Sequence, residues 1–359
     1  MNDASAQVLV VGAGPAGLAV SACLKSAGVT FRLVDLHGVP GGAYARAYAS
    51  MKLASPARYN VLPGLALESA GEYLSVEAYR RYLNAYAAHH GLAVQHDKVR
   101  RVERAATGFR ATFEHAADTA QYNYVVVATG MFDFPRSPDI PGLNAADAPE
   151  VLHAAAWKGP DAFRGRRLLI VGGATSAVEI AEECARAGIT TTVSARGKIV
   201  KLLPQRILGR DNHDYFRFFE SLPRFVMRSF CEGTRNLPGT DLGFGEFRRH
   251  GLIEVCDSLV RVDGNSVAFA DGSRAQFSAI VLATGYRYEA GFLPADVARA
   301  PGLGQPLADG CESRSWTDLF VVGMPCVRGL NSPFLRGIAS DASWIAEKIS
   351  SRIEKRRAH

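Results

Sequence analysis

The cysteines of this 359-residue chain lack the spacing of a chemical motif, because none forms a CxxC pair or a metal-ligand pair. Their apolar surroundings predict reduced, mostly buried thiols, as is typical of a cytoplasmic protein. The spacing excludes an internal CxxC dithiol of the thioredoxin type, and we expect no metal site. The six cysteines are Cys23, Cys184, Cys231, Cys256, Cys311 and Cys326.

Long apolar runs and a basic, aromatic-rich face are also lacking. No run approaches the ~20 apolar residues that a membrane span needs. The first strand is expected at residues 8–11, which leaves no signal peptide before it. The net charge of +6 is modest, and its densest run, residues 352–357, fits a solvated helix end. We therefore expect a cytoplasmic protein with no membrane span and no nucleic-acid partner.

Glycine is abundant, with 35 residues placed mostly in short turn clusters between apolar runs. This pattern favours an α/β protein with many strand–helix crossovers. The length of 359 residues suggests two or three domains.

The N-terminal segment predicts a dinucleotide cradle. A buried strand at residues 8–11 leads into Gly12, Gly14 and Gly17, which fit G-x-G-x-x-G at the start of a helix. The first glycine permits the turn, the second admits a pyrophosphate, and the third lets helix and strand pack closely. A second strand ends in Asp35, whose carboxylate suits the free hydroxyls of a ribose. Glycines alone would also fit an ordinary turn. The complete order of strand, glycine loop, helix, second strand and acid favours a cradle for FAD or NAD.

The same order of elements occurs again after a proline-rich linker at residues 135–142. Here a strand leads into Gly172, and Ala174 takes the place of the central glycine. The second strand ends in Arg196, where the first unit has its acid, and a guanidinium there suits a 2′-phosphate. Lys198 and Lys201 add positive charge. A ligand-free turn and an exposed basic loop are the alternatives; the repeat favours NADPH.

Both units close with Ala-Thr-Gly, at residues 128–130 and 283–285, and a long helix is expected from residue 333 to 353. We therefore predict an α/β fold with two Rossmann-like dinucleotide-binding domains, the second inserted into the first. The first predicted domain comprises residues 1–142 and 286–359, and the second residues 143–285.

With these motifs in hand, the chain resembles the class B flavin-dependent monooxygenases of the flavin-containing monooxygenase group, and most of all their short bacterial relatives. Half of that family's signature F-x-G-x-x-x-H-x-x-x-aromatic is present as His153 and Trp157, with Asp147 and Pro149 in the places of the phenylalanine and glycine. The resemblance implies two domains of the glutathione-reductase type, with FAD in the N-terminal site and NADPH in the second. Residues 1–142 and 286–359 would then form the FAD domain, and residues 143–285 the NADPH domain inserted into it.

Three further departures concern residues near the flavin. Tyr44 stands where the family usually has tryptophan, the asparagine of larger members is missing around Ser55 and Pro56, and Met324 stands where disulfide-reductase relatives have aspartate.

The motifs and the resemblance together give the expected site residues. FAD contacts are expected at Gly12, Ala13, Gly14, Pro15, Ala16, Gly17, Asp35, Gly42, Tyr44, Val99, Ala128, Thr129, Gly130, Gly323 and Met324. NADPH contacts are expected at Gly172, Gly173, Ala174, Thr175, Ser176, Arg196, Lys198, Ala283, Thr284 and Gly285. No catalytic side chain is assigned; Ser55 and Asn331 are the candidates near the flavin.

The resemblance implies an NADPH-dependent FAD monooxygenase that uses O2. Through a C4a-(hydro)peroxyflavin it would oxygenate a small nitrogen, sulfur or arsenic nucleophile or a carbonyl. Two alternatives stay open: an NADPH-dependent reductase acting on a quinone, an external disulfide or a protein partner, and a non-catalytic flavin-binding module. The phenylalanine-rich residues 202–247 could cap an apolar pocket or form a homodimer face, although most such aromatics belong to a core or an interface.

Overall fold

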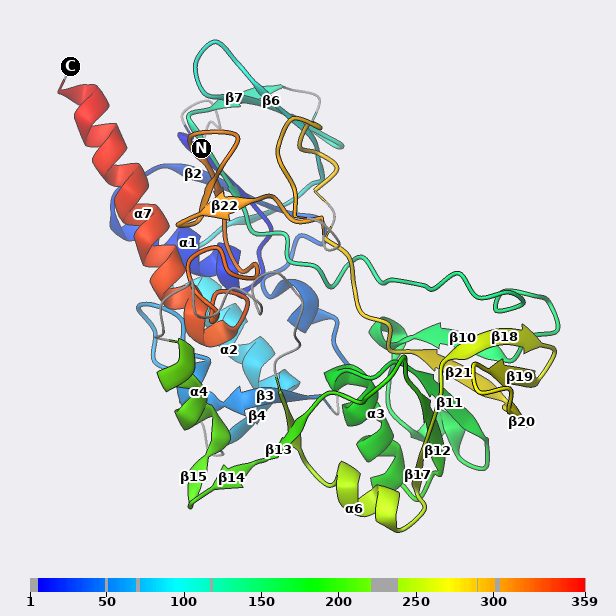
Figure 1. Ribbon diagram of the computed structural model, residues 1–359. Coiled ribbons are helices and arrows are strands. Elements are labelled where there is room, and N and C mark those ends of the chain that lie inside the picture. Colours follow the sequence, from blue (N-terminus) through cyan, green and yellow to red (C-terminus); the bar gives the residue numbers. More distant parts are fainter. Residues whose placement is uncertain are drawn as a thin grey trace.

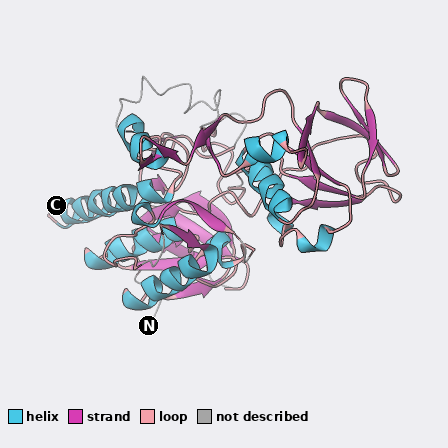
Figure 2. Cartoon of the chain, turned by 90° about the horizontal axis from the view of Figure 1, so that it is seen from below, coloured by secondary structure: helices cyan, strands magenta, loops and turns pink. Residues whose placement is uncertain are grey.

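The computed structural model describes residues 6–48, 51–68, 72–116, 119–220, 238–288, 290–300 and 304–358. These residues form two lobes, each built on a largely parallel sheet (Figures 1 and 2). None of the helices in these ranges is both long and apolar enough to cross a membrane.

The first lobe contains a seven-stranded sheet in the order β22-β23-β24-β9-β1-β2-β5. Its central strands β1 (Val8–Val11) and β9 (Tyr124–Val127) are buried on both faces. This burial explains why both read as unbroken apolar runs. Helices α1 (Pro15–Ser26) and α7 (Leu335–Arg357) pack against each other beside this sheet (Figure 1). The other strands are β2 (Phe31–Asp35), β5 (Val94–His96), β22 (Ala308–Asp309), β23 (Glu312–Ser313) and β24 (Leu319–Val321).

The second lobe contains a parallel five-stranded sheet in the order β10-β21-β11-β12-β17. Its strands lie between residues 150 and 282, so the chain leaves the first sheet after β9 and returns to it at β24 and its hairpin neighbours. The predicted fold class is confirmed, and the exact domain boundaries stay a prediction. The elements are β10 (Glu150–His153), β11 (Leu168–Val171), α3 (Thr175–Arg186), β12 (Thr191–Ser194), α6 (Phe244–Arg249), β17 (Ile253–Cys256) and β21 (Ala279–Leu282).

Smaller sheets complete each lobe. A three-stranded antiparallel sheet lies in each: β6 (Val99–Arg104), β7 (Phe109–Phe113) and β8 (Ala120–Tyr122) in the first, and β18 (Leu259–Asp263), β19 (Ser266–Phe269) and β20 (Arg274–Gln276) in the second. Short 3-10 turns cover Gly42–Ala45, Ala57–Tyr59, Ala154–Ala156 and Asp161–Phe163.

Two local features differ from the sequence pattern, which shows no period over residues 38–65 and predicts a helix over residues 72–90. The stretch 38–65 contains a strand, β3 (Lys52–Pro56), which pairs antiparallel with β4 (Tyr73–Ser75). The helix expected from Glu72 begins after this strand, as α2 (Val76–His89). Ser75 ends β4 and caps α2, because its side chain accepts a hydrogen bond from the amide of Ala78.

Between β12 and β17 the chain crosses toward the first lobe. Its elements are β13 (Leu202–Pro204), β14 (Arg206–Ile207), β15 (Arg210–Asp211), α4 (Asn212–Glu220) and β16 (Gly239–Asp241). The segment 221–237 and the side chains of Phe218 and Phe219 lie outside the described part of the structure. The expectation of an aromatic cap or homodimer face at residues 202–247 therefore stays a prediction.

Candidate dinucleotide sites

The first cradle is held together by backbone contacts that leave no room for side chains. Gly12 has φ +104°, and a Cβ added there would lie 2.5 Å from the carbonyl oxygen of Ala128. A Cβ at Gly17 would overlap the carbonyl oxygen of Gly12. Both glycines are thus explained by the packing of strand, loop and helix.

Gly14 differs, because a Cβ added there would meet no protein atom within 4 Å. Its backbone is extended, with φ −68°, so its conformation does not require glycine either. Gly14 precedes the first residue of α1, where the backbone amides are without helical partners. A pyrophosphate approaching these amides accounts for a glycine that the protein itself does not need. The residues present therefore fit the expected FAD.

Asp35 is 7% exposed and ties the cradle to the end of β2. Its carboxylate accepts hydrogen bonds from the amides of Ala13 and His37, both at 2.8 Å. Each oxygen retains acceptor capacity for a ribose hydroxyl. The predicted acid is thus fixed in orientation at the edge of the cradle.

The segment after β2 packs directly on this loop. The amide of Gly41 donates to the carbonyl of Ala13 at 2.8 Å, and a Cβ at Gly42 would lie 3.0 Å from the Cα of Gly14. The ring of Tyr44 stands edge-on against Tyr79, with centroids 5.1 Å apart. Tyr44 therefore belongs to an aromatic contact with α2 as well as to the surroundings of the cradle.

The remaining predicted FAD residues gather around the same loop. A Cβ at Gly323 would lie 3.1 Å from the Cβ of Ala16, and the neighbouring Met324 is fully buried. Thr129 and Tyr288 approach within 3.3 Å through their hydroxyls. Val99 is the most distant; it is buried at the start of β6, two residues after Asp97, whose amide donates to the carbonyl of Asp35.

Of the two catalytic candidates, Ser55 has a partner that sequence reasoning passed over. The hydroxyl of Ser55 donates to the side-chain oxygen of Asn60 at 2.6 Å, and the Asn60 amide donates back to the Ser55 carbonyl at 3.0 Å. Asn60 is fully buried. Asn331 lies in the loop before α7, where its carbonyl accepts from the amide of Phe334 at 2.9 Å. Ser55 and Asn331 belong to the two separate chain segments that build the first lobe. Their contacts assign no chemistry to either residue.

The second cradle repeats the geometry of the first. Gly172 has φ +145°, and a Cβ there would overlap the carbonyl of Ala283, as Gly12 does with Ala128. The amide of Ala283 donates to the carbonyl of Val171 at 2.8 Å, matching the bond from Ala128 to Val11. The repeat seen in the sequence is therefore a repeat of backbone contacts.

Basic residues occupy the place of the acid in this second cradle. Ala174 caps α3 in an extended conformation that alanine adopts freely, with φ −103°. The loop that carries Arg196 and Lys198 lies over the cradle, since the amide of Val200 donates to the carbonyl of Gly173 at 2.7 Å. Both basic side chains are exposed. They are available to an anionic group bound at the start of α3.

Thr284 and Gly285 connect the two linkers between the lobes. The Thr284 hydroxyl donates to the carbonyl of Arg136, and the Gly285 carbonyl accepts from the amide of Arg136 at 2.9 Å. His153 Nε2 lies 3.1 Å from the same Gly285 oxygen, and burial lowers the pKa of His153 despite this contact. Half of the family signature thus lies at the crossing between the lobes.

Glu179 is a further candidate that sequence reasoning missed. It lies on α3, one turn from Glu183, whose carboxylate accepts from the indole nitrogen of Trp157 at 2.8 Å. Burial, together with Glu182 and Glu183, raises the pKa of Glu179 to about 7. Tyr48 of the first lobe packs on the second core, and Glu179 and Glu183 help to raise its pKa. The signal in the sequence that could have indicated this cluster is the spacing of Glu179 and Glu183, which lie four residues apart on one helix.

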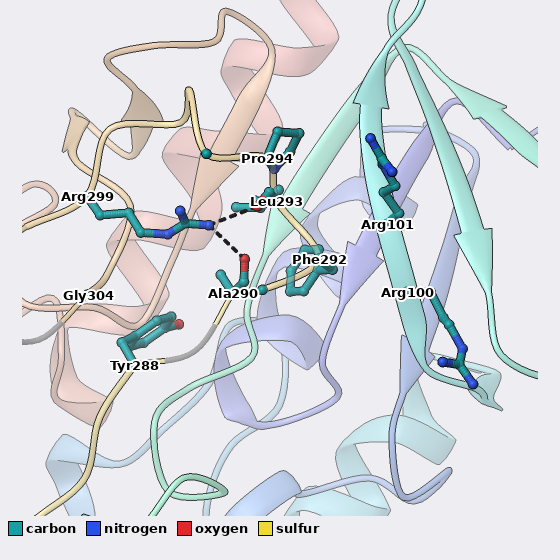
Figure 3. A pocket seen from close by; sticks show the side chains of 11 residues that line it. Arg100, Arg101, Tyr288, Ala290, Phe292, Leu293, Pro294, Arg299 and Gly304 are labelled. Carbon is teal, nitrogen blue, oxygen red and sulfur yellow. Dashed lines mark hydrogen bonds between the residues drawn. The ribbon is translucent and has the colours of Figure 1, made fainter.

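A cavity of about 730 Å³ lies between β6 and the segment that follows Tyr288 (Figure 3). Arg299 donates to the carbonyls of Ala290 and Leu293 at 3.0 and 2.9 Å across this segment. None of the predicted cofactor residues lines the cavity. It is therefore separate from both cradles.

Among the described residues, the expectation of reduced cysteines was wrong for Cys326. Cys326, three residues after Gly323, is disulfide-bonded. Cys23, Cys184, Cys256 and Cys311 form no disulfide, and Cys231 lies outside the described residues. Isolated spacing in sequence cannot predict a bond between distant cysteines.

Comparisons with known proteins agree with this geometry. A family model described as pyridine nucleotide-disulphide oxidoreductase matches residues 9–207. The probable indole-3-pyruvate monooxygenase YUCCA1 of Arabidopsis thaliana is 27% identical over 315 residues, which cover 78% of this chain and 75% of that protein.

Among solved structures, the flavin-containing monooxygenase from Stenotrophomonas maltophilia has a TM-score of 0.81 at 23% identity and covers 97% of this chain and 98% of its own. The bacillithiol disulfide reductase Bdr (YpdA) from Staphylococcus aureus has a TM-score of 0.74 at 15% identity, covering 96% and 98%. At these identities the structural likeness is evidence of the fold alone.

Proposed function

This chain belongs to the pyridine nucleotide-disulphide oxidoreductase family, and we propose that it is an FAD monooxygenase that oxygenates a small nucleophilic or carbonyl substrate at the expense of NADPH. The predicted resemblance to class B flavin-dependent monooxygenases is confirmed. The chain is a flavin-dependent oxidoreductase with FAD and NADPH as its cofactors. The proposal concerns what the reduced flavin then does.

The observation that carries the proposal is the matched pair of cradles with opposite charges. Asp35 presents a carboxylate at the first, and Arg196 a guanidinium at the second. A carboxylate suits the unmodified ribose of FAD, and a guanidinium suits the 2′-phosphate of NADPH. Two different dinucleotides bound by one chain support hydride transfer from one to the other.

In this proposal the protein binds, orients and excludes water, and the cofactors supply hydride transfer and the activation of dioxygen. The free amides at the start of α1 hold the FAD pyrophosphate, and Asp35 holds the ribose. Arg196 and Lys198 hold the 2′-phosphate of NADPH. Val322 and Met324, both fully buried, exclude water from the side of the site next to Gly323.

One observation favours the reductase alternative. Cys326 follows Gly323 closely and is disulfide-bonded, so a second redox group lies near residues expected to contact FAD. In that alternative, bound FAD would supply the two electrons that open the S–S bond of Cys326, and two protons would complete the two thiols. An internal disulfide of this kind would pass electrons to an external acceptor without oxygen insertion.

Stopped-flow spectroscopy and isotope labelling test the two proposals together. The FAD-loaded protein is first titrated with NADPH without oxygen. One equivalent per FAD is expected for the monooxygenase, and two equivalents would support the disulfide alternative. Labelled dioxygen is then admitted with a thioether, a tertiary amine, a ketone or indole-3-pyruvate, the last chosen from the name of the plant relative. Label in a product supports the proposal; consumption of NADPH with only hydrogen peroxide formed, for every substrate, would contradict it.

A further inference from the structure

The segment 201–220, here called the docking arm, leaves the second lobe and lies against the first. It comprises β13, the β14–β15 hairpin and α4. Figure 1 shows α4 beside the N-terminal end of α7, with β13 leading back toward α3. The arm therefore crosses from one lobe to the other.

The root of the docking arm lies on the second cradle itself. The amide of Val200 donates to the carbonyl of Gly173 at 2.7 Å, just before the arm begins. At the return, the amide of Gly239 donates to the carbonyl of Lys201 at 2.9 Å, and a Cβ at Gly239 would lie 3.7 Å from the hydroxyl of Thr175. Movement of the arm would therefore move the start of α3.

The far end of the docking arm is fixed to the first lobe by its acidic residues. The arm contains only three, and each contacts that lobe. Asp211 accepts from the hydroxyl of Tyr73 in β4. Asp214 accepts from Arg58 at 2.7 Å and from the hydroxyl of Tyr59. Glu220 forms a two-pronged ion pair with Arg336, in the first turn of α7.

Burial shows which of these contacts holds the arm most firmly. The side chains of Arg336 and Glu220 are 11% and 9% exposed, whereas those of Arg58 and Asp214 are 47% and 31% exposed. Exposed ion pairs contribute little, but removal of one partner of a buried pair leaves an uncompensated charge. The Glu220–Arg336 pair is therefore expected to dominate.

Asp211 adds a second buried anchor. One of its oxygens accepts from both the amide and the Nδ1 of His213, each at 2.9 Å, while the other faces Tyr73. Burial would raise the pKa of Asp211, but the hydrogen bonds from Tyr73 and His213 outweigh it and leave that pKa below its usual range. The carboxylate is thus charged and saturated with partners from both lobes.

We propose that the docking arm sets the position of the NADPH cradle relative to the flavin, with Glu220 and Asp211 as positioning residues for hydride transfer. The inference rests on the two proposed cofactor sites and not on oxygen insertion. Hydride transfer depends steeply on the distance between the reacting atoms, and a misplacement of about 1 Å can cost ~100-fold in rate. A rigid connection between the cradle and α7 would hold this distance.

The test is the rate of flavin reduction by NADPH, measured without oxygen in the FAD-loaded full chain. Glu220→Gln is expected to lower the limiting rate about tenfold or more, with less change in the NADPH concentration at half-saturation, because the cradle itself is intact. Asp161→Asn is the matched control. It removes a carboxylate–arginine pair with Arg164 that lies entirely within the second lobe, and its rate should equal that of the unaltered protein.

If Glu220→Gln does not fold, exchanging the charges of Arg58 and Asp214 tests the proposal instead. Arg58→Asp places two carboxylates together on an exposed surface and should slow reduction about threefold; adding Asp214→Arg should restore the rate. Flavin content and dithionite reduction should be unchanged throughout. Unchanged NADPH rates in both Glu220→Gln and Arg58→Asp would overturn the proposal, as would an unaltered protein that NADPH does not reduce. If the rate of flavin reduction depends on the docking arm but no oxygenated product forms, the positioning role of the docking arm is supported. Only the monooxygenase proposal is then refuted.

Discussion

At the residue scale, the two cradles differ most at Gly14 and Ala174, which precede the first residues of their helices. In the proposed NADPH site, the methyl group of Ala174 would lie where the pyrophosphate comes closest to the backbone. We predict that Ala174→Gly lowers the Kd for NADPH about threefold or more, since a pyrophosphate can then approach the amides directly. Glycine is also an acceptable helix cap, so the melting temperature should be maintained. Titration of the FAD-loaded protein with NADPH measures the effect.

Ala187→Gly is the control for that change, because Ala187 caps the opposite end of the same helix. It should leave the Kd unaltered. A weaker or unchanged affinity in Ala174→Gly would show that the phosphates do not contact this position.

A second residue-scale prediction concerns coenzyme choice. Arg196 is exposed beside the second cradle, so its replacement should not disturb packing. Arg196→Gln should lower kcat/KM for NADPH by about tenfold or more and leave that for NADH nearly unchanged, because only NADPH carries the 2′-phosphate. Steady-state rates with both coenzymes measure the ratio. The exposed Arg274→Gln, elsewhere in the same lobe, should change neither; an equal loss for both coenzymes in Arg196→Gln would contradict the assignment.

The residues that could be predicted from sequence are those whose role is local. Gly17 and Asp35 make their contacts within one strand–loop–helix–strand unit, so their spacing carries the information. Asn60 and Glu179 could not be predicted, because their burial depends on segments far away in the chain.

At the element scale, α7 begins under tight steric control. A Cβ added at Gly337, in its first turn, would overlap the carbonyl of Asn331. Gly337→Ala should therefore displace the loop before α7, destabilise the protein by about 1–3 kcal/mol and weaken FAD retention. Thermal unfolding and flavin fluorescence measure both effects.

Gly245→Ala in α6 is the matched control. Its added Cβ would meet only a carboxylate oxygen of Asp241, at 3.4 Å. It should stabilise that helix by about 0.5–1 kcal/mol, because alanine has the higher helix propensity. If Gly337→Ala and Gly245→Ala had the same effect on thermal unfolding and FAD retention, the close approach at Gly337 would not control the start of α7.

Elements with a strong periodic or apolar pattern were predictable, and those that need a distant partner were not. The strands β1 and β11 and the helix α1 lie within a few residues of their expected positions. β3 was missed because it is a strand only through pairing with β4, beyond a gap of sixteen residues. Because β4 was missed for the same reason, the sequence predicted the start of α2 at residue 72, four residues too early.

At the scale of the whole molecule, the repeated motif was enough to predict the insertion of one lobe in the other. It could not predict the contacts between the lobes. Those contacts join β4 to β15 and α7 to α4, and side chains so far apart in sequence leave no periodic signal. The crossing is thus where structure adds most to the sequence.

We predict that the crossing also makes the stability of the molecule depend on pH. The pKa of Glu179, which faces Tyr48 of the other lobe, is raised to about 7 by burial and by Glu182 and Glu183. The folded state then binds this proton more tightly than the unfolded chain, so stability should fall as pH rises from about 4.5 to about 7 and stay reduced above it. Glu179→Gln, neutral throughout, should flatten the fall in melting temperature across this window, whereas the exposed Glu246→Gln should reproduce the unaltered profile. Equal slopes for the unaltered protein and Glu179→Gln would mean that this carboxyl stays solvated between the lobes.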